Sequence, residues 1–247
     1  MLIALDKNNQ RVCASDAERG DEFYCPYCSS PMLVKKGAIK VPHFAHMSAT
    51  TTCEYDRESK EHMLTKLSIY DWLAEQGVDE VDMEYPLEEC RPDIFFVHQG
   101  KKVAVEIQLS PIPAAEIILR TQLMNRSGIY VLWLIQSLPI DSEFRARDMW
   151  RFLNGWYYGA LFSWDNEYSE IIEYRILNAE RYNHFTGWTR TLKNTITAWE
   201  RRRLDLLSDF SLKGRKFTPQ FKRYPAAKLY MPKNSITSQP RLPVGAF

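Results

Sequence analysis

Two carboxylates lie on consecutive expected strands and could together hold a divalent cation. Asp93 stands near the start of a strand expected at Arg91–Val97, and Glu106 lies within one expected at Lys102–Leu109. The turn residues Gln99–Gly100 predict that these strands form an antiparallel hairpin, which would bring the two carboxylates together. Such an oxygen pair suits Mg²⁺ or Mn²⁺, and either ion can activate water for attack on a phosphodiester. The spacing alone leaves open a second interpretation, in which Asp93 begins a turn and Glu106 lies on a solvated face.

The strand around Glu106 separates polar from apolar side chains. Alternation directs Glu106 and Gln108 to one face of the strand and Val105 and Ile107 to the other. A carboxylate in so apolar a strand is costly to bury without a partner. A metal ion shared with Asp93 would remove that cost.

A second group of residues, near the N-terminus, has the composition of a structural zinc site. Cys25 and Cys28 have the tight-turn spacing of a zinc knuckle, and His43, His46 and Cys53 follow. Structural zinc takes four nitrogen or sulfur ligands in a tetrahedron, so five candidates compete for four places. We predict that Cys25, Cys28, His46 and Cys53 are the ligands, with His43 as a substitute or as a group beside the metal. The alternative is a metal-free hairpin whose cysteines and histidines are buried by chance.

Composition places the chain among globular proteins of a reducing compartment. Its 247 residues, of which 45% are hydrophobic, suffice for a full core and more than one module. The cysteine count is 5, and the clustering of cysteine with histidine favours metal binding over disulfides. No apolar run in the sequence reaches the length of a membrane span, and the first residues lack the pattern of a signal peptide. We therefore expect a cytoplasmic protein.

Charge is distributed unevenly along the chain. The net charge is +1, but the residues from Arg201 onward carry 11 Lys/Arg against 2 Asp/Glu, a balance of +9, which leaves −8 for residues 1–200. A basic segment attached to an acidic body is typical of proteins that bind nucleic acid.

Hydrophobic periodicity predicts the elements that hold these residues. Residues 1–57 are expected to form a small β-rich module with a hairpin of Met32–Lys36 and Ile39–Val41. Residues 57–76 have an apolar face near period 3.6, which predicts a helix that ends at Gly77.

The middle of the chain predicts three strands, a helix and a further strand. The three strands run from Val81 to Ser110, the first of them at Val81–Leu87. A helix is expected at Ala114–Asn125, ended by Gly128. Ile129–Ile135 is almost continuously apolar, which is typical of a central strand covered on both faces.

The C-terminal part is less regular. Residues 144–176 are rich in aromatics and predict a helix followed by strands that pack on the core, whereas the pattern of 186–208 predicts another helix. From Phe210, basic residues are interleaved with Phe, Tyr and Pro. Basic charge attracts phosphates and aromatic rings stack on bases, so this tail is a candidate DNA contact. The alternative is a partly disordered tail whose charges are solvated.

The order of short motifs resembles a known family. Pro92-Asp93 followed by Glu106-Ile107-Gln108 resembles the PD-(D/E)xK nuclease superfamily, in the variant that has Gln in place of the final Lys. With CPYC, PHFAH, ESKEH-x3-K, RPDI, EIQLS-x3-P and an arginine at position 120, the ordered set resembles the competence protein CoiA-like family over about residues 20–137. The resemblance implies an α+β or α/β fold: a restriction-endonuclease-like αβββαβ core at 58–137, a zinc-ribbon-like module at 1–57, and a mixed C-terminal region with a basic aromatic tail at 138–247.

The resemblance also implies roles for residues outside the two strands. Glu61, on the first helix, would help to bind the metal, and His62 or Lys66 would face the substrate. Arg120, on the second helix, would contact the scissile phosphate. From the residues themselves, Glu61 could instead compensate the helix dipole, and Arg120 could form a surface ion pair with Glu116 at the i,i+4 spacing.

Together these features predict a metal-dependent DNA nuclease. Asp93 and Glu106, the backbone carbonyl of Ile107 and Glu61 would bind one or two Mg²⁺ or Mn²⁺ ions, and Gln108 would position the attacking water. Because Gln cannot replace the charge of the usual Lys, a nuclease fold that only binds DNA is one alternative, and a zinc-organised protein-binding adaptor is another. The expected partners are single-stranded, duplex or branched DNA, recombination or defence proteins, and a second copy of the chain for cutting both strands.

Overall fold

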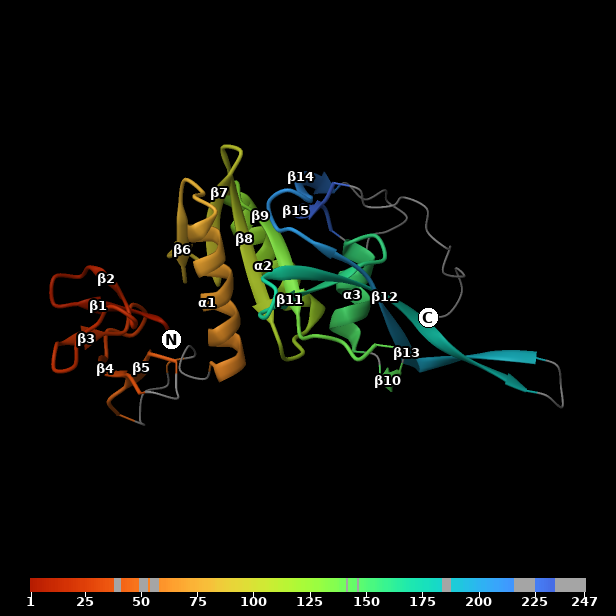
Figure 1. Cartoon of the computed structure of the whole chain (residues 1–247), viewed down its shortest axis with the longest axis horizontal. Helices are drawn as coiled ribbons and strands as arrows, with labels where there is room; N and C mark the ends of the chain where they lie inside the picture. The colour runs from red at the N-terminus through yellow and green to blue at the C-terminus, as the bar shows by residue number, and fades with distance from the viewer. Residues whose placement is uncertain are drawn as a thin grey trace.

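The computed structural model of the chain describes residues 1–37, 41–48, 53, 58–140, 142–145, 147–183, 188–215 and 225–233. Within these residues the chain folds into three sheets and three helices (Figure 1). The N-terminal sheet lies at one end of the molecule, a six-stranded sheet with two helices lies in the middle, and a long hairpin extends from the other end. The fold is of the mixed α+β class, as predicted.

The N-terminal module is a five-stranded antiparallel sheet with its own small core. Its order is β2-β1-β3-β4-β5, with β1 at Ile3–Asp6, β2 at Arg11–Cys13, β3 at Phe23–Tyr24, β4 at Pro31–Lys35 and β5 at His43–His46. Phe23, Met32 and Phe44 are buried in that core. The hairpin was predicted with the wrong second strand, because β4 pairs with β5 at His43–His46. Residues 39 and 40 of the predicted strand Ile39–Val41 lie outside the described residues.

The middle of the molecule has the predicted element order αβββαβ. The helix α1 at Lys60–Glu75 is followed by β6 at Val81–Met83, β7 at Ile94–His98, β8 at Lys101–Gln108, α2 at Ala114–Arg126 and β9 at Tyr130–Ile135. Helix α1 packs against β6, β7 and β8, and α2 packs against β9. The strand interiors of β8 and β9 are buried at successive residues, because both faces of these strands are covered.

Local backbone chemistry explains where these elements begin and end. Gln99 and Gly100 both have positive φ, 51° and 69°, which suits the two-residue turn joining the antiparallel strands β7 and β8. Ser59 caps α1 by accepting a hydrogen bond from the His62 amide, 3.1 Å away. Strand β6 ends earlier than predicted, because Glu84 has a φ of 51° and leaves the extended conformation.

The region after β9 contains a short helix and a second sheet. Helix α3 occupies Asp148–Trp156, and the sheet order is β10-β13-β12-β11, with β10 at Glu143–Arg145, β11 at Leu161–Asp165, β12 at Glu170–Asn183 and β13 at Trp188–Leu204. The helix and strands expected in 144–176 are therefore present. Strands β12 and β13 form the long hairpin that extends away from the body (Figure 1).

The helix predicted at 186–208 is wrong, because Trp188–Leu204 forms β13. The misleading feature was the spacing of apolar and basic residues. Thr195 and Thr197 are half-buried while Ile196 and Ala198 are buried, which is a period of two. The β-branched residues Thr195, Ile196 and Thr197 also favour a strand.

The last described strands return to the central sheet and correct the prediction of a separate basic tail. Strand β14 at Phe210–Arg215 pairs with β15 at Ala227–Pro232, and β15 lies parallel to β9, so the six-stranded order is β14-β15-β9-β8-β7-β6. Phe210 and Tyr230 are fully buried. Residues 216–224 and 234–247, which carry much of the predicted tail, lie outside the described residues. Strands β14 and β15 follow the predicted domain boundary at residue 137, yet they belong to the same sheet as the strands before it.

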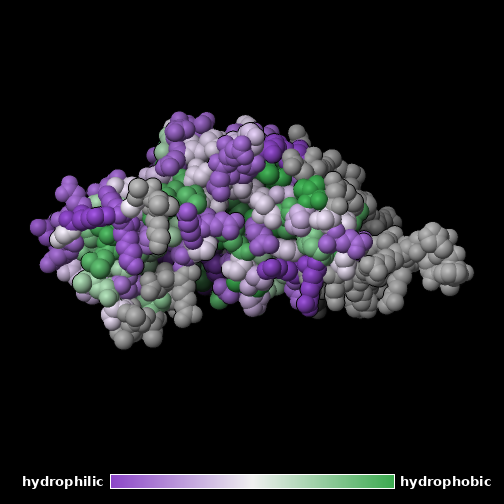
Figure 2. All heavy atoms as spheres, turned by 60° about the horizontal axis from the view of Figure 1, so that its bottom comes forward, coloured by the Kyte–Doolittle hydropathy of each residue, from purple (hydrophilic) through white to green (hydrophobic). Residues whose placement is uncertain are grey.

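Part of the C-terminal positive charge is neutralised within the body. Arg202 pairs with Glu173 at 2.6 Å, and Arg203 pairs with Asp165 at 3.0 Å. The surface in Figure 2 is mixed, with hydrophilic residues over much of the face shown and smaller hydrophobic areas between them. Among the described residues, no helix is long and apolar enough to cross a membrane.

Candidate active site

A polar cavity of about 270 Å³ opens where the start of α1 meets the strands β7 and β8. Its lining combines carboxylates with cations and one amide, from Glu58, His62, Arg91, Asp93, Gln108 and Arg120. The three antiparallel strands, α1 and α2 thus bring together residues that are far apart in the sequence, including the predicted Asp93, Gln108 and Arg120.

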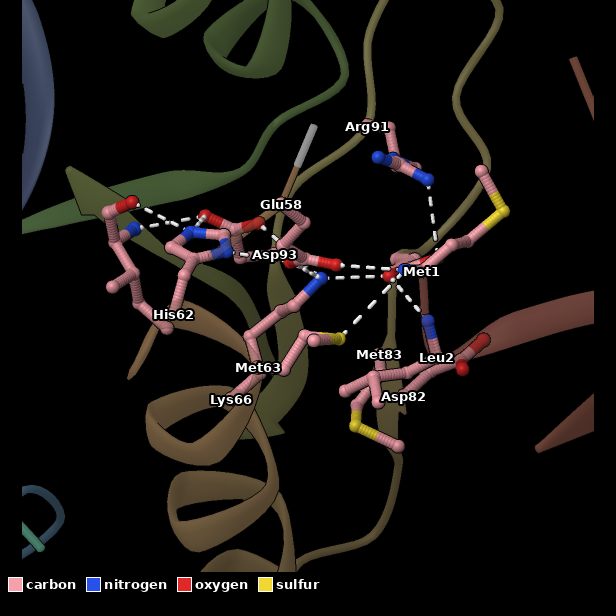
Figure 3. A network of polar contacts seen from close by, with 12 residues as sticks. Met1, Leu2, Glu58, His62, Met63, Lys66, Asp82, Met83, Arg91 and Asp93 are labelled. Atoms are coloured by element: carbon pink, nitrogen blue, oxygen red, sulfur yellow. Dashed lines mark hydrogen bonds and ion pairs between the residues drawn. The ribbon is translucent and has the colours of Figure 1, made fainter. Parts of the chain in front are cut away.

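Asp93 and His62 are in direct contact at the floor of this cavity. The His62 Nε2 atom lies 3.2 Å from Asp93 Oδ2 and 2.8 Å from the carbonyl oxygen of Ile107, and its Nδ1 atom lies 2.5 Å from Glu58 Oε1 (Figure 3). Both ring nitrogens therefore face acceptors, which requires the doubly protonated imidazolium. Burial lowers the pKa of His62, but the Asp93 and Glu58 carboxylates outweigh that effect and raise it to about 10.

The Asp93 carboxylate is buried and ionised. Its Oδ2 atom accepts a hydrogen bond from the Ile107 amide at 2.9 Å. Burial raises the pKa of Asp93, but His62 and then Lys66 hold it below its ordinary range. The group is therefore a carboxylate anion at neutral pH.

Lys66 is buried behind Glu58 and Asp93 and does not line the cavity, which corrects its predicted substrate-facing role. Its side chain is fully buried and its ammonium contacts Glu58, Glu84 at 2.6 Å and Asp93 at 3.9 Å (Figure 3). Glu84 is also fully buried, and its second oxygen contacts Arg91 at 3.1 Å. Lys66 therefore neutralises buried carboxylates and is unable to reach a phosphate in the cavity.

Glu106 is buried next to Arg120 and has one unsatisfied oxygen. The Arg120 guanidinium donates to Glu106 Oε2, and its carbon lies 5.2 Å from the centroid of the Trp133 ring. These contacts, and not the alternative ion pair with Glu116, position it. Glu106 Oε1 is buried without a hydrogen-bond partner among the described residues. Burial raises the pKa of Glu106, Arg120 opposes this and Asp93 adds to it, which places the pKa at about 7.

The donor set of this cavity fits a hard divalent cation. Ligand atoms of Glu58, His62 and Asp93 lie within 4.8 Å of one another. Glu106, a predicted metal ligand, is neither in that group nor among the residues that line the cavity. Its Oε1 atom is buried without a hydrogen-bond partner among the described residues, and such an atom is costly unless a ligand satisfies it. Carboxylate oxygens suit Mg²⁺ and Mn²⁺, whereas His62 in its imidazolium form has no lone pair to offer a metal.

Gln108, at the end of β8, lines the cavity. Its Nε2 atom donates to the carbonyl oxygen of Ser110 at 2.7 Å. That bond fixes the plane of the amide, so the side-chain oxygen of Gln108 has a defined direction.

Glu61, the predicted third metal ligand, does not join the cluster. It is exposed on α1 and is absent from the cavity lining, whereas Glu58 contacts both His62 and Lys66. The helical period explains the correction, because residues 58, 62 and 66 are spaced by four and share one side of α1 and of the segment entering it. This spacing is visible in the sequence and could have identified Glu58 as a member of the cluster. No comparable pattern in the sequence identifies Glu84 as the buried partner of Lys66 and Arg91.

The N-terminal module contains the predicted Cys₃His cluster. Ligand atoms of Cys25, Cys28, His46 and Cys53 lie within 4.8 Å of one another, with 3.2 Å between Cys28 Sγ and His46 Nε2 and 3.8 Å between the sulfurs of Cys25 and Cys53. Zn–S bonds of about 2.3 Å in a tetrahedron place ligands about 3.8 Å apart, so these atoms fit a zinc ion. His43 is not in the cluster, because its Nδ1 atom lies 2.8 Å from the Val41 carbonyl.

Fold and site together define a mixed α+β protein with a nuclease-like core and an N-terminal Cys₃His module. The family described as "Competence protein CoiA, nuclease-like domain" matches residues 58–178, and "Competence protein CoiA, N-terminal domain" matches residues 5–56. The chain belongs to the competence protein CoiA family.

A curated relative agrees with this assignment. Competence protein CoiA of Bacillus subtilis (strain 168) is 30% identical over 115 residues, which are 46% of this chain and 31% of the relative. The chain therefore matches about a third of the length of that relative. No solved structure matches the chain.

Proposed function

We propose that this protein is a metal-dependent deoxyribonuclease that hydrolyses phosphodiester bonds in incoming or recombining DNA. The observation that carries the proposal is the group of Glu58, His62 and Asp93 that lines one cavity, together with a buried, unsatisfied oxygen on Glu106 of strand β8. A protein that only bound DNA would gain nothing from carboxylates at this cavity, since carboxylates repel phosphates. The membership in a family with a nuclease-like domain supports the same conclusion.

The residues that would hold Mg²⁺ or Mn²⁺ are Asp93, Glu106 and Glu58, with His62 and the Ile107 carbonyl beside them. When bound, such an ion supplies an activated water and stabilises charge on the phosphate. It would also supply positive charge for the unsatisfied oxygen of Glu106.

The side chains of the cavity have separate tasks in this proposal. His62, held as the imidazolium between Asp93 and Glu58, keeps a proton on Nε2 at the cavity wall. Gln108, whose amide is fixed by Ser110, orients water through its side-chain oxygen. Arg120 directs positive charge toward the phosphate and is positioned by Glu106 and the Trp133 ring.

The test is cleavage of labelled single-stranded, duplex and branched DNA in Mg²⁺ or Mn²⁺. Asp93→Asn and Glu106→Gln should each abolish cleavage while DNA binding persists, because they remove charge with little change of shape. Glu61→Gln is the matched control and should cleave at the wild-type rate, since Glu61 is exposed outside the cavity. Glu58→Gln should behave like the two buried variants.

Two results would redirect the proposal. DNA binding by a folded, metal-loaded wild type that cleaves none of the substrates would favour an accessory protein that keeps the nuclease fold. Absence of both binding and cleavage would favour the zinc-organised adaptor, with another protein as the partner.

We also propose that the Cys₃His cluster binds one structural zinc ion. Three sulfurs and one imidazole nitrogen are a common closed set for structural zinc. Metal analysis of the purified protein should give one zinc per chain, and Cys28→Ser should lose it. His43→Ala should retain zinc, since His43 points to the Val41 carbonyl.

A further inference from the structure

The N-terminal module reaches the cavity through Tyr27. This residue lies within the Cys25–Cys28 turn, and the guanidinium carbon of Arg91 lies 4.4 Å from the centroid of its ring. Arg91 lines the cavity beside Asp93, whereas Tyr27 is not among the lining residues. The ring therefore supports the guanidinium from outside the cavity.

Further contacts fix Arg91 in this position. Its Nη1 atom lies 3.1 Å from Glu84 Oε2, and a side-chain hydrogen bond joins it to Tyr27. Glu84 is itself held by Lys66 at 2.6 Å and by the amide of Leu2 at 3.1 Å (Figure 3). The Arg91 side chain is 12% exposed. A partly desolvated cation over a tyrosine ring is a stabilising arrangement.

The turn that carries Tyr27 is a rigid support. The Ser29 amide donates to the Cys25 carbonyl at 2.9 Å, and the Cys25 amide donates to the Ser30 carbonyl at 2.9 Å. Cys25 is fully buried. The tyrosine ring therefore has a backbone that cannot shift easily away from Arg91.

We propose that Arg91 binds a phosphate of the nucleic acid in the cavity and that Tyr27 is the positioning residue that holds it there. The proposal rests on the proposed nuclease function and makes the N-terminal module part of the substrate site. A guanidinium has five N–H donors in a planar fork that matches phosphate oxygens, so its contact to Glu84 does not exhaust its capacity. A cation at this place also offsets the repulsion between a phosphate and the carboxylates of Asp93 and Glu58.

DNA affinity and its salt dependence test the role of Arg91. Binding of a short labelled oligonucleotide, single-stranded and duplex, is measured by anisotropy in Ca²⁺ across a series of salt concentrations. Arg91→Gln should raise Kd about tenfold and reduce the salt slope by about one phosphate contact. Arg91→Lys should keep the slope at a weaker affinity. Arg126→Gln is the matched control and should change neither quantity, because Arg126 is 67% exposed and pairs only loosely with Glu89.

A double-mutant cycle tests the role of Tyr27. Tyr27→Leu removes the ring and the hydroxyl and should raise Kd about threefold to tenfold, whereas Tyr27→Phe keeps the ring, loses only the hydrogen bond to Arg91 and should have a smaller effect. In the Arg91→Gln background, Tyr27→Leu should have no further effect on Kd, because its action passes through Arg91. A merely structural role would weaken binding equally in both backgrounds.

The outcomes separate this inference from the function on which it rests. Cleavage that requires Asp93, together with wild-type affinity and salt slope in Arg91→Gln, would overturn the inference and leave the nuclease. Additive effects in the cycle would overturn the positioning role of Tyr27. A wild type that binds no DNA would overturn both the inference and the proposed function.

Discussion

Replacing Lys66 by Met should destabilise the protein by breaking a buried charge cluster. The Lys66 ammonium is fully buried and contacts Glu58 and Glu84, and Glu84 has no exposed surface. Removing one partner of a buried pair costs about 3–5 kcal/mol, because an uncompensated charge stays inside the protein. Glu84 keeps Arg91 at 3.1 Å and the Leu2 amide at 3.1 Å, so we expect the lower end, about 3 kcal/mol.

The assay is equilibrium unfolding in urea together with a thermal scan. A loss of about 3 kcal/mol corresponds to a decrease in Tm of about 6–12 °C for a chain of this size. The double variant Lys66→Met/Glu84→Gln should recover much of the lost stability, because the unpaired carboxylate is removed as well. Arg126→Gln, at an exposed pair, should change the free energy of unfolding by less than about 0.5 kcal/mol.

A refuting result is defined by the same data. Lys66→Met with an unfolding free energy within about 1 kcal/mol of the wild type would mean that Glu84 is protonated or hydrated and that Lys66 does not compensate it. Equal destabilisation in the single and double variants would show that the two charges do not interact.

Three further predictions concern the core, the zinc cluster and pH. Phe210→Ala should lower the free energy of unfolding in urea by about 3–5 kcal/mol, because Phe210 is fully buried. Truncation after Ser208 removes β14 and β15 and should unfold the central sheet; a truncated chain that stays folded would contradict the strand assignment. Zinc chelation should lower Tm in the wild type but not in Cys28→Ser, and an equal response of both would exclude the cluster as the zinc site. Burial raises the pKa of Glu58, but His62 and Lys66 outweigh burial and lower it to about 2. In the presence of a chelator, the free energy of unfolding should therefore fall as pH decreases from about 4.3, the pKa of an unfolded Glu, toward 2. Glu58→Gln should flatten that pH dependence.

The αβββαβ core could be predicted from the sequence because its signals are local. Gln99–Gly100 has the backbone freedom of a hairpin turn, Gly77 and Gly128 have the positive φ of helix ends, and Ile129–Ile135 has the apolar run of a strand covered on both faces. The Cys₃His cluster was predictable for the same reason, since the CPYC spacing alone places two thiolates at one turn.

The errors arise where non-local pairing decides the structure. Strand β15 joins β9 across the chain, so no local pattern distinguishes it from a tail. In β13, basic and aromatic side chains with helical spacing mask the alternation that pairing with β12 imposes. Glu84 has a positive φ and partners that are distant in the sequence, and a single sequence contains no signal for such a residue.

The two central carboxylates are compensated unequally, and this difference indicates where a cation would bind most favourably. Asp93 contacts His62 and lies near Lys66, so its charge is balanced without metal. Glu106 contacts Arg120 through one oxygen, and its other oxygen lacks a partner among the described residues. Added positive charge therefore lowers the energy of Glu106 more than that of Asp93. The cations around Asp93 balance its charge, so we expect a bound cation to be most favourable where it satisfies the free oxygen of Glu106.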